Sequence, residues 1–114
     1  MATDCIFCKI AAGDIPGDFV YRDDNVFVIR DIAPKAPVHL LVIPIKHFEA
    51  LTNLTPDDHG MVGAMLQAAK EAARSEGVAE GGYRLVINQG ENGRQDVAHL
   101  HMHVMGGKRL GAMG

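Results

Sequence analysis

Residues 99–105 read His-Leu-His-Met-His-Val-Met, and this alternation predicts a β-strand with different chemistry on its two faces. Leu100, Met102 and Val104 belong to the buried face, whereas imidazoles occupy the other face, which such strands usually expose to solvent. Successive imidazoles on one face lie about 7 Å apart, close enough to share one phosphate or one metal ion. Because histidine changes its protonation state near neutral pH, three in a row indicate a functional site.

Turn signals and apolar patterns divide the rest of the chain into short strands and two helices. The predicted elements are a short helix over 5–12, strands over 18–22, 25–31, 38–44 and 83–88, and a long helix over 55–75. Thr55 suits the N-cap of the long helix, and Pro56 suits its first position. Because the strands do not alternate regularly with helices, we expect an α+β domain.

Length and charge exclude several classes of protein. A chain of 114 residues has room for a single domain, residues 1–114. The formal net charge of −3 leaves no basic excess to neutralise polymer phosphates, which disfavours nucleic acid as the main partner. No segment approaches the roughly 20 apolar residues of a membrane span. Residues 1–4 lack the start of a secretory leader, so we expect a cytoplasmic location and reduced cysteines.

The long helix carries an unusually wide apolar stripe. Its apolar residues between Met61 and Ala73 cover about 160° of the helix surface, more than one core-facing stripe requires. A deeply buried helix would give this pattern. We favour the alternative, in which the helix packs on its own sheet and also on a second subunit, so that the protein is a homodimer.

Two mechanisms suit a row of three imidazoles, and the residues alone leave both open. In the first, the histidines bind Zn²⁺ with an open coordination position, assisted by an acid such as Glu91 or Asp96. In the second, the central imidazole attacks phosphorus, the leaving group departs, and water cleaves the phospho-imidazole. Asn88 and Gln95, neutral donors near a glycine-rich loop, suit a ribose or a phosphate and are therefore candidate nucleotide-binding residues.

Several segments resemble the histidine triad (HIT) nucleotide-binding family, and together they cover nearly the whole chain. The family motif His-φ-His-φ-His-φ-φ, with φ apolar, is satisfied at every position of residues 99–105. The other matching segments are 5–10, 30–34, 36–44 followed by His47, and 88–90. The resemblance implies the HIT fold, an α+β fold with an antiparallel five-stranded sheet, one short and one long helix, and a two-fold dimer.

The branch that the chain most resembles hydrolyses purine nucleoside phosphoramidates, releasing AMP or GMP and an amine through a phospho-histidine. By position, the resemblance implies that His101 is the nucleophile, that His103 binds phosphate, and that His39 supports the far ring nitrogen of the nucleophile. Asp31 is implied to bind the ribose hydroxyls, since a carboxylate accepts hydrogen bonds. The implied apolar base pocket comprises Ile6, Phe7 and Ile32, together with Ile10 and Ile29, which suit the core equally well.

Cys5 and Cys8 form a CxxC pair, which in a reducing compartment favours a metal site over a disulfide. The resemblance implies that His47 and His99 complete a Cys₂His₂ set suited to structural Zn²⁺, as in some bacterial members and in the related galactose-phosphate uridylyltransferases. His99 would then brace the strand instead of touching the substrate, and the chemistry itself would require no cofactor. In the alternative, both cysteines are small buried residues of a short helix.

Three features depart from the family pattern and leave the leaving group of the substrate undefined. Asp96 stands where relatives often have serine, so its carboxylate would repel a phosphate unless it turns away or Arg94 balances its charge. Arg94 stands where glycine is common, and the chain shows no Trp-Pro-rich tail. Two alternative functions stay open: a nucleotide-binding scaffold dimer with incidental turnover, and a metal-dependent hydrolase.

Overall fold

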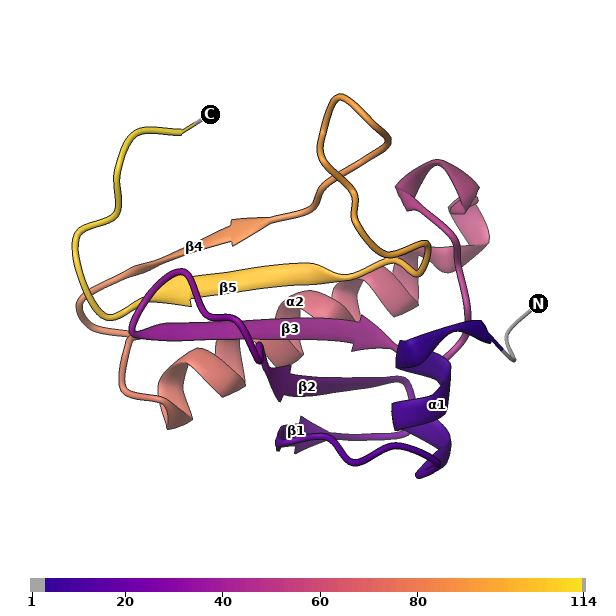
Figure 1. Ribbon diagram of the computed structural model, residues 1–114, viewed down its shortest axis with the longest axis horizontal. Helices are drawn as coiled ribbons and strands as arrows, with labels where there is room; N and C mark the ends of the chain where they lie inside the picture. The colour runs from indigo at the N-terminus through magenta and orange to yellow at the C-terminus, as the bar shows by residue number, and fades with distance from the viewer. Residues whose placement is uncertain (1–3, 114) are drawn as a thin grey trace.

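The computed structural model describes residues 4–113, which form a five-stranded antiparallel sheet in the order β1-β2-β3-β5-β4 (Figure 1). The strands are β1 (Phe19–Arg22), β2 (Val26–Arg30), β3 (Val38–Pro44), β4 (Tyr83–Val86) and β5 (Met102–Gly106). The helices are α1 (Ile6–Ala12) and α2 (His59–Ser75), with short 3-10 turns η2 (Leu51–Asn53) and η3 (Pro56–Asp58). The α+β class is therefore confirmed. Residues 1–3, part of the N-terminus expected to carry no leader, lie outside the described residues.

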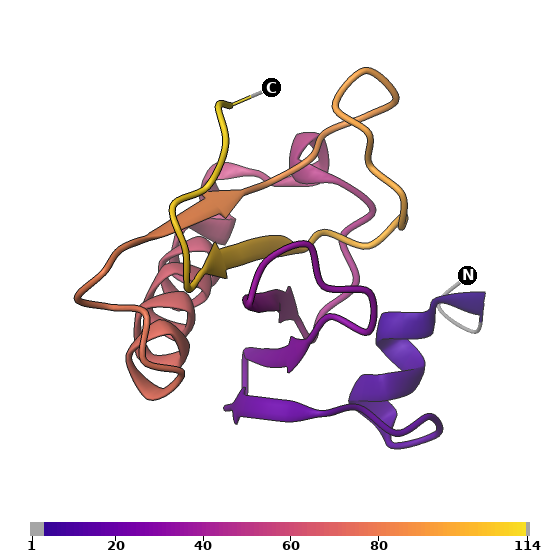
Figure 2. The same cartoon turned by 60° about the vertical axis from the view of Figure 1, so that its left-hand side comes forward.

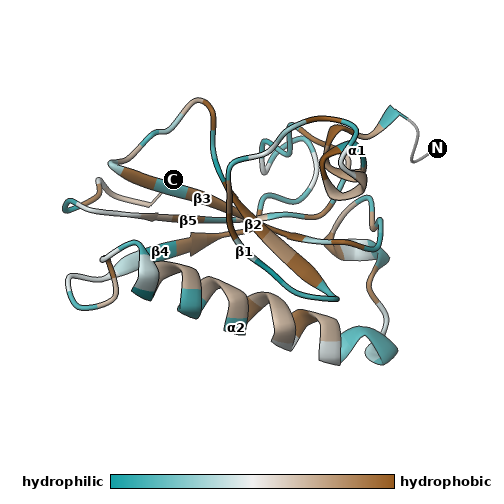
Figure 3. Cartoon of the chain, turned by 90° about the horizontal axis from the view of Figure 1, so that it is seen from below, coloured by the Kyte–Doolittle hydropathy of each residue, from teal (hydrophilic) through white to brown (hydrophobic). Residues whose placement is uncertain are grey.

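The two helices lie on opposite faces of the sheet, and each covers its own part of the core (Figures 2 and 3). On the α2 side, buried residues such as Val28 and Leu40 pack with the alanines of that helix. On the α1 side, Phe7 packs with Phe27 and with alternate residues of β3. Because successive strand residues point to opposite faces, β3 is buried on both sides from residue 39 to 44, as predicted.

The long helix begins later than the sequence pattern predicts. Thr55 Oγ1 accepts a hydrogen bond from the Asp57 N–H, and the Thr55 N–H donates to Asp58 Oδ2. These reciprocal bonds, together with Pro56, close the tight turn η3, and α2 follows from residue 59. Leu66 of α2 is 50% exposed, which is not the pattern of a deeply buried helix. None of the described helices combines the length and apolar character needed to cross a bilayer.

The histidine-rich strand is shorter than predicted. It begins at Met102, so His99 and His101 precede β5, and His99 lies in a bend. The Leu100 N–H leaves the ladder and donates to the Phe48 carbonyl, whereas the His99 ring contacts the Pro44 carbonyl at the end of β3. The expectation of a solvent-exposed imidazole face is also wrong, because the side chains of His99 and His101 are buried on the α1 side.

Candidate active site

His101 presents one ring nitrogen with a free lone pair. Its Nδ1 lies 2.8 Å from the His99 carbonyl oxygen, which only accepts hydrogen bonds, so Nδ1 carries the hydrogen. The lone pair of the neutral ring is then on Nε2, which makes no hydrogen bond and lies 3.6 Å from Asp96 Oδ1. The Phe7 ring packs edge-on against His101 at a centroid distance of 5.2 Å. This arrangement fixes the tautomer that a nucleophilic imidazole requires.

His103 is held in the opposite tautomer by His39. The Lys35 backbone N–H donates to His39 Nδ1 at 3.0 Å, so His39 carries its hydrogen on Nε2 and donates to His103 Nδ1 at 2.9 Å. The hydrogen of a neutral His103 is therefore on Nε2. Burial, followed by the neighbouring His101, lowers the pKa of His103 to about 4. At neutral pH, His103 thus offers an uncharged N–H donor.

The predicted partner of His39 is therefore wrong. We expected His39 to support the far ring nitrogen of His101, but the structure pairs it with His103 and gives that role to the His99 carbonyl. Asp31 lies beside this pair, with Oδ2 at 3.4 Å from His39 Nε2 and Oδ1 accepting from the Ala33 N–H. Asp31 is thus part of the same cluster as His39 and His103.

A cleft of about 460 Å³ opens beside His103. Its lining residues are Lys35, His39, Val86, Asn88, Arg94, Gln95, Asp96, His103 and Met105. The two candidate amides, however, already bind the loop: Asn88 Nδ2 donates to the Gly93 carbonyl, and Gln95 Nε2 donates to the carbonyls of residues 49 and 97. These residues therefore shape the wall of the cleft, and Gln95 in particular has little capacity left for a ligand.

The apolar residues expected around a base do not form one group. Phe7 is buried against the rings of His99 and His101. Ile10 and Ile29 belong to the core on the α1 side. Ile6 and Ile32 are instead 46% and 99% exposed. Exposed isoleucines are open to contact with a ligand, but the structure does not pack them against the histidines.

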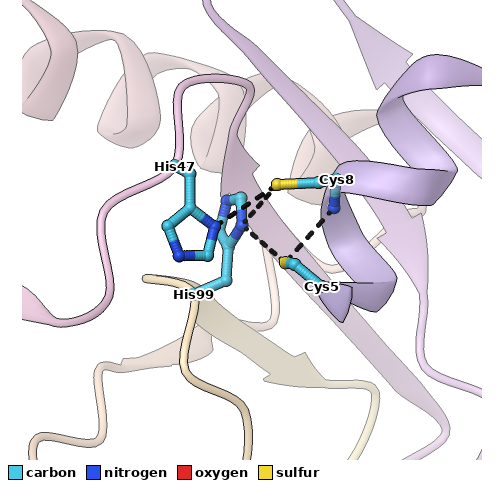
Figure 4. Close-up of side chains that lie close together, drawn as sticks. All are labelled: Cys5, Cys8, His47 and His99. Carbon is cyan, nitrogen blue, oxygen red and sulfur yellow. Dashed lines mark hydrogen bonds between the residues drawn. The ribbon is translucent and has the colours of Figure 1, made fainter. Parts of the chain in front are cut away.

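Cys5, Cys8, His47 and His99 converge from three segments of the chain, and their side chains point toward one another (Figure 4). Cys8 Sγ lies 3.3 Å from His47 Nδ1, and Cys5 Sγ lies 3.1 Å from His99 Nδ1. His99 Nε2 donates to the Pro44 carbonyl, which leaves the Nδ1 lone pair facing the sulfurs. The four donor atoms lie within 4.8 Å of one another, and two thiols with two imidazoles are a donor set of structural Zn²⁺ sites, so these residues suit that ion.

The Cys8 thiol of this cluster is protonated in the absence of a metal. Burial, followed by the hydrogen bond with Cys5, raises the pKa of Cys8 to about 11. Burial also lowers the pKa of His99 to about 4, so its ring is neutral and able to bind a metal. A bound Zn²⁺ would replace the thiol protons and hold the start of α1 against the segment before β5.

The three histidines of the motif do not share one metal ion. Among residues 4–113, the two groups able to hold a metal are the cysteine-containing cluster and the set Asp31, His39 and His103. Neither group contains His101, and the His39–His103 pair of the second group is joined by a direct hydrogen bond. The alternative of a metal-dependent hydrolase with the triad as ligands therefore finds no support in the geometry.

A family model described as "Scavenger mRNA decapping enzyme C-term binding" matches residues 4–112. The fold also matches the crystal structure of a HIT family hydrolase from Legionella pneumophila Philadelphia 1, with 45% identity, a TM-score of 0.91, and coverage of 93% of this chain and 95% of that one. The chain belongs to the histidine triad family.

Two further relatives of this histidine triad protein bear on its site. The purine nucleoside phosphoramidase of Escherichia coli (strain K12) is 43% identical over 113 residues, which cover 99% of this chain and 95% of the relative. A zinc-bound histidine triad family protein from Mycobacterium smegmatis is 34% identical with a TM-score of 0.79, over 95% of this chain and 78% of that one. The present chain is a hydrolase of this family.

Proposed function

We propose that this hydrolase cleaves the P–N bond of purine nucleoside 5′-phosphoramidates through a phospho-histidine formed on His101. The observation that carries the proposal is the fixed tautomer of His101, whose Nδ1 hydrogen is held by the His99 carbonyl and whose Nε2 is free to react. The 43% identity to the E. coli purine nucleoside phosphoramidase supports the substrate class.

In the first step, His101 Nε2 attacks phosphorus, the P–N bond breaks, and the amine leaves after taking a proton. The His103 N–H donates to a non-bridging phosphate oxygen, and His39 keeps that donor in place. Asp31 is proposed to accept from the ribose hydroxyls, and the purine is proposed to bind near Ile6, Phe7 and Ile32. Water then cleaves the bond between His101 Nε2 and phosphorus, releases AMP or GMP, and restores the neutral imidazole.

The test is hydrolysis of adenosine 5′-phosphoramidate by the wild type and by His101→Ala. The variant should lose at least about a thousandfold in kcat, because the reacting nitrogen is gone, and should still bind AMP. His59→Ala, at an exposed position of α2, is the matched control and should retain full activity. Equal rates for wild type and His101→Ala would disprove the mechanism. Binding of AMP by both without turnover of the phosphoramidate would favour the nucleotide-binding scaffold.

Two further properties are proposed with this activity. A structural Zn²⁺ held by Cys5, Cys8, His47 and His99 fits the donor set, and it would hold the segment that carries the His99 carbonyl. A homodimer is proposed through α2 and the edge strand β4, where Leu66 and Leu85 are 50% and 38% exposed. A cytoplasmic location agrees with a CxxC pair that must stay reduced to bind a metal.

A further inference from the structure

The Asp96 carboxylate faces the reacting nitrogen of His101. Its Oδ1 lies 3.6 Å from His101 Nε2. A phosphorus atom poised for attack would lie at a similar distance from Nε2, about 3–3.5 Å. The His101 side chain is 3% exposed, whereas that of Asp96 is 78% exposed. Asp96 therefore lies on the solvent side of Nε2, and a phosphoryl group that approaches Nε2 from that side comes close to this carboxylate.

No basic side chain neutralises Asp96. Among residues 4–113, its one ion-pair contact is with His101, and Arg94 has none. Arg94 adopts a left-handed backbone conformation (φ 62°), and with Lys35 it lines the cleft beside His103. Within residues 4–113, Arg94 thus forms no ion pair with Asp96, although both side chains line the same cleft. An unpaired carboxylate beside a phosphate is unfavourable unless the substrate brings a positive charge of its own.

Further acidic residues line two hollows next to Asp96. Asp96 also lines a second hollow of about 590 Å³, which contains Glu49 and Glu91, and a third of about 380 Å³, which contains Glu49 and Asp4. Neither has a lysine or arginine among the described residues that line it. Asp96 thus lies where the cleft with basic residues meets hollows lined by acids.

An in-line displacement sends the leaving amine away from His101 Nε2. Phe7 packs against the His101 ring, and Asp96, which lines the acidic hollows, lies beside Nε2, so an amine that leaves on the exposed side passes this carboxylate. We propose that Asp96, with Glu49 and Glu91 beyond it, selects phosphoramidates whose leaving amine carries a second, positively charged amino group. This inference rests on the proposed function. The His101–phosphorus bond forms as the P–N bond breaks, the amine takes its proton from solvent, and Asp96 supplies only its charge.

Three adenosine phosphoramidates of similar size test this selection. Their leaving amines are 1,3-diaminopropane, butylamine and β-alanine. The far end of the amine is therefore positively charged, neutral and negatively charged, respectively. The wild type should show a kcat/KM about fivefold higher for the cationic than for the neutral substrate, and lowest for the anionic one. In Asp96→Asn, the ratio of kcat/KM for the cationic substrate to kcat/KM for the anionic substrate should fall to within about twofold of unity. Asp96→Glu should retain the order, and Glu80→Gln, at an exposed acid remote from the three hollows, should keep the wild-type ratios.

The outcomes separate this inference from the proposed function. If the wild type hydrolyses unsubstituted adenosine 5′-phosphoramidate but shows equal kcat/KM for the three substituted substrates, the proposed function is supported and the selection by charge is overturned. A charge preference that persists unchanged in Asp96→Asn would also overturn it. Failure of the wild type to cleave any phosphoramidate, the unsubstituted one included, would remove the proposed function and this inference together.

Discussion

At His101 and His103, groups from elsewhere in the fold determine which ring nitrogen bears the hydrogen. His101 Nδ1–H donates a hydrogen bond to the His99 carbonyl, and His39 donates one to Nδ1 of His103. The two neighbouring imidazoles therefore present opposite chemistry, a lone pair on one and an N–H on the other. This difference suits His101 to act as the nucleophile and His103 to donate a hydrogen bond to the phosphate, although both are histidines.

Burial of neutral His103 predicts that the protein loses stability in acid. The folded-state pKa of about 4 lies below the ordinary value of 6.5, so the unfolded chain binds the proton first as the pH falls. The contribution of His103 is therefore complete above about pH 6.5 and is lost progressively toward pH 4. We compare the free energy of unfolding in urea at pH 7 and pH 4.5 for the wild type and His103→Gln. Its loss between the two pH values should be larger in the wild type by about 2 kcal/mol.

Exposed His59 provides the comparison for this measurement. His59→Gln should follow the wild type at both pH values, because its ring is not buried. An identical pH dependence in wild type and His103→Gln would show that His103 is not held neutral.

The partner of His39 was beyond sequence-based prediction because it depends on strand register. Leu41 pairs with His103 in the β3–β5 ladder, which makes His39 a diagonal neighbour of His103 on the same face. His101 lies beyond the last pair of that ladder, Val42 with Met102, and is too far along the chain for His39. The identities of the site residues follow from the motif. Strand register and the contacts of the Lys35 N–H and of the carbonyls of residues 44 and 99 depend on the backbone, so residue types do not predict them.

Among the connecting elements, the loop between β4 and β5 positions Asp96 and the cleft wall. The loop is closed by the Asn88 side chain on the Gly93 carbonyl and by Gln95 Oε1, which accepts from the Gly90 N–H. A Cβ at Gly93 would lie inside contact distance of the Gln89 backbone, which has no flexible end to move aside. Gly93 is therefore required for the close approach of the two halves of the loop.

Gly93→Ala is predicted to impair catalysis through this loop. The added methyl group must displace the segment from 88 to 96, and kcat/KM for adenosine 5′-phosphoramidate should fall about tenfold or more. Gly60→Ala on α2, where a Cβ meets nothing within 4 Å, is the control and should leave the rate unchanged. Full activity in Gly93→Ala would show that the loop geometry is not needed for turnover.

The start of α1 is predicted to depend on a metal. Purified protein should contain one Zn²⁺ per chain, and a chelator should lower its melting temperature by several degrees. Cys8→Ser, which removes one donor, should lower both the zinc content and the melting temperature. The chelator should then have no further effect on this variant. Equal chelator sensitivity of wild type and Cys8→Ser, or wild type without bound metal, would contradict the structural zinc site.

At the scale of the whole molecule, the sheet separates the candidate active site from the surface proposed for dimerisation. The two helices cover opposite faces of the sheet (Figure 3). The histidines lie on the α1 side, where Phe7 packs against His99 and His101, whereas Leu66 of α2 is exposed. The wide apolar stripe of 61–73 predicts that α2 packs on the sheet and on a second subunit. The structure shows the packing on the sheet, and the contact with a second subunit stays a prediction. No sequence pattern specified which residues of α2 face outward. Those positions depend on how the helix rotates against the sheet.

Disruption of the proposed dimer is the prediction at this scale. Leu66→Glu places a charge in the exposed apolar surface of α2 and should convert a dimer to a monomer in sedimentation velocity. Leu51→Glu changes an apolar residue of similar exposure, 42%, outside α2 and should leave the dimer intact. A wild type that sediments as a monomer at micromolar concentration would refute the homodimer.

Rapid quenching of the wild type during hydrolysis of adenosine 5′-phosphoramidate should trap the phospho-histidine proposed on His101. Peptide mapping by mass spectrometry under alkaline conditions should find AMP attached to His101 of the segment 99–105. The adduct should be absent from His101→Ala and present in His103→Gln at a level set by its slower turnover. Turnover without any adduct, or an adduct on a residue other than His101, would show that His101 is not the nucleophile.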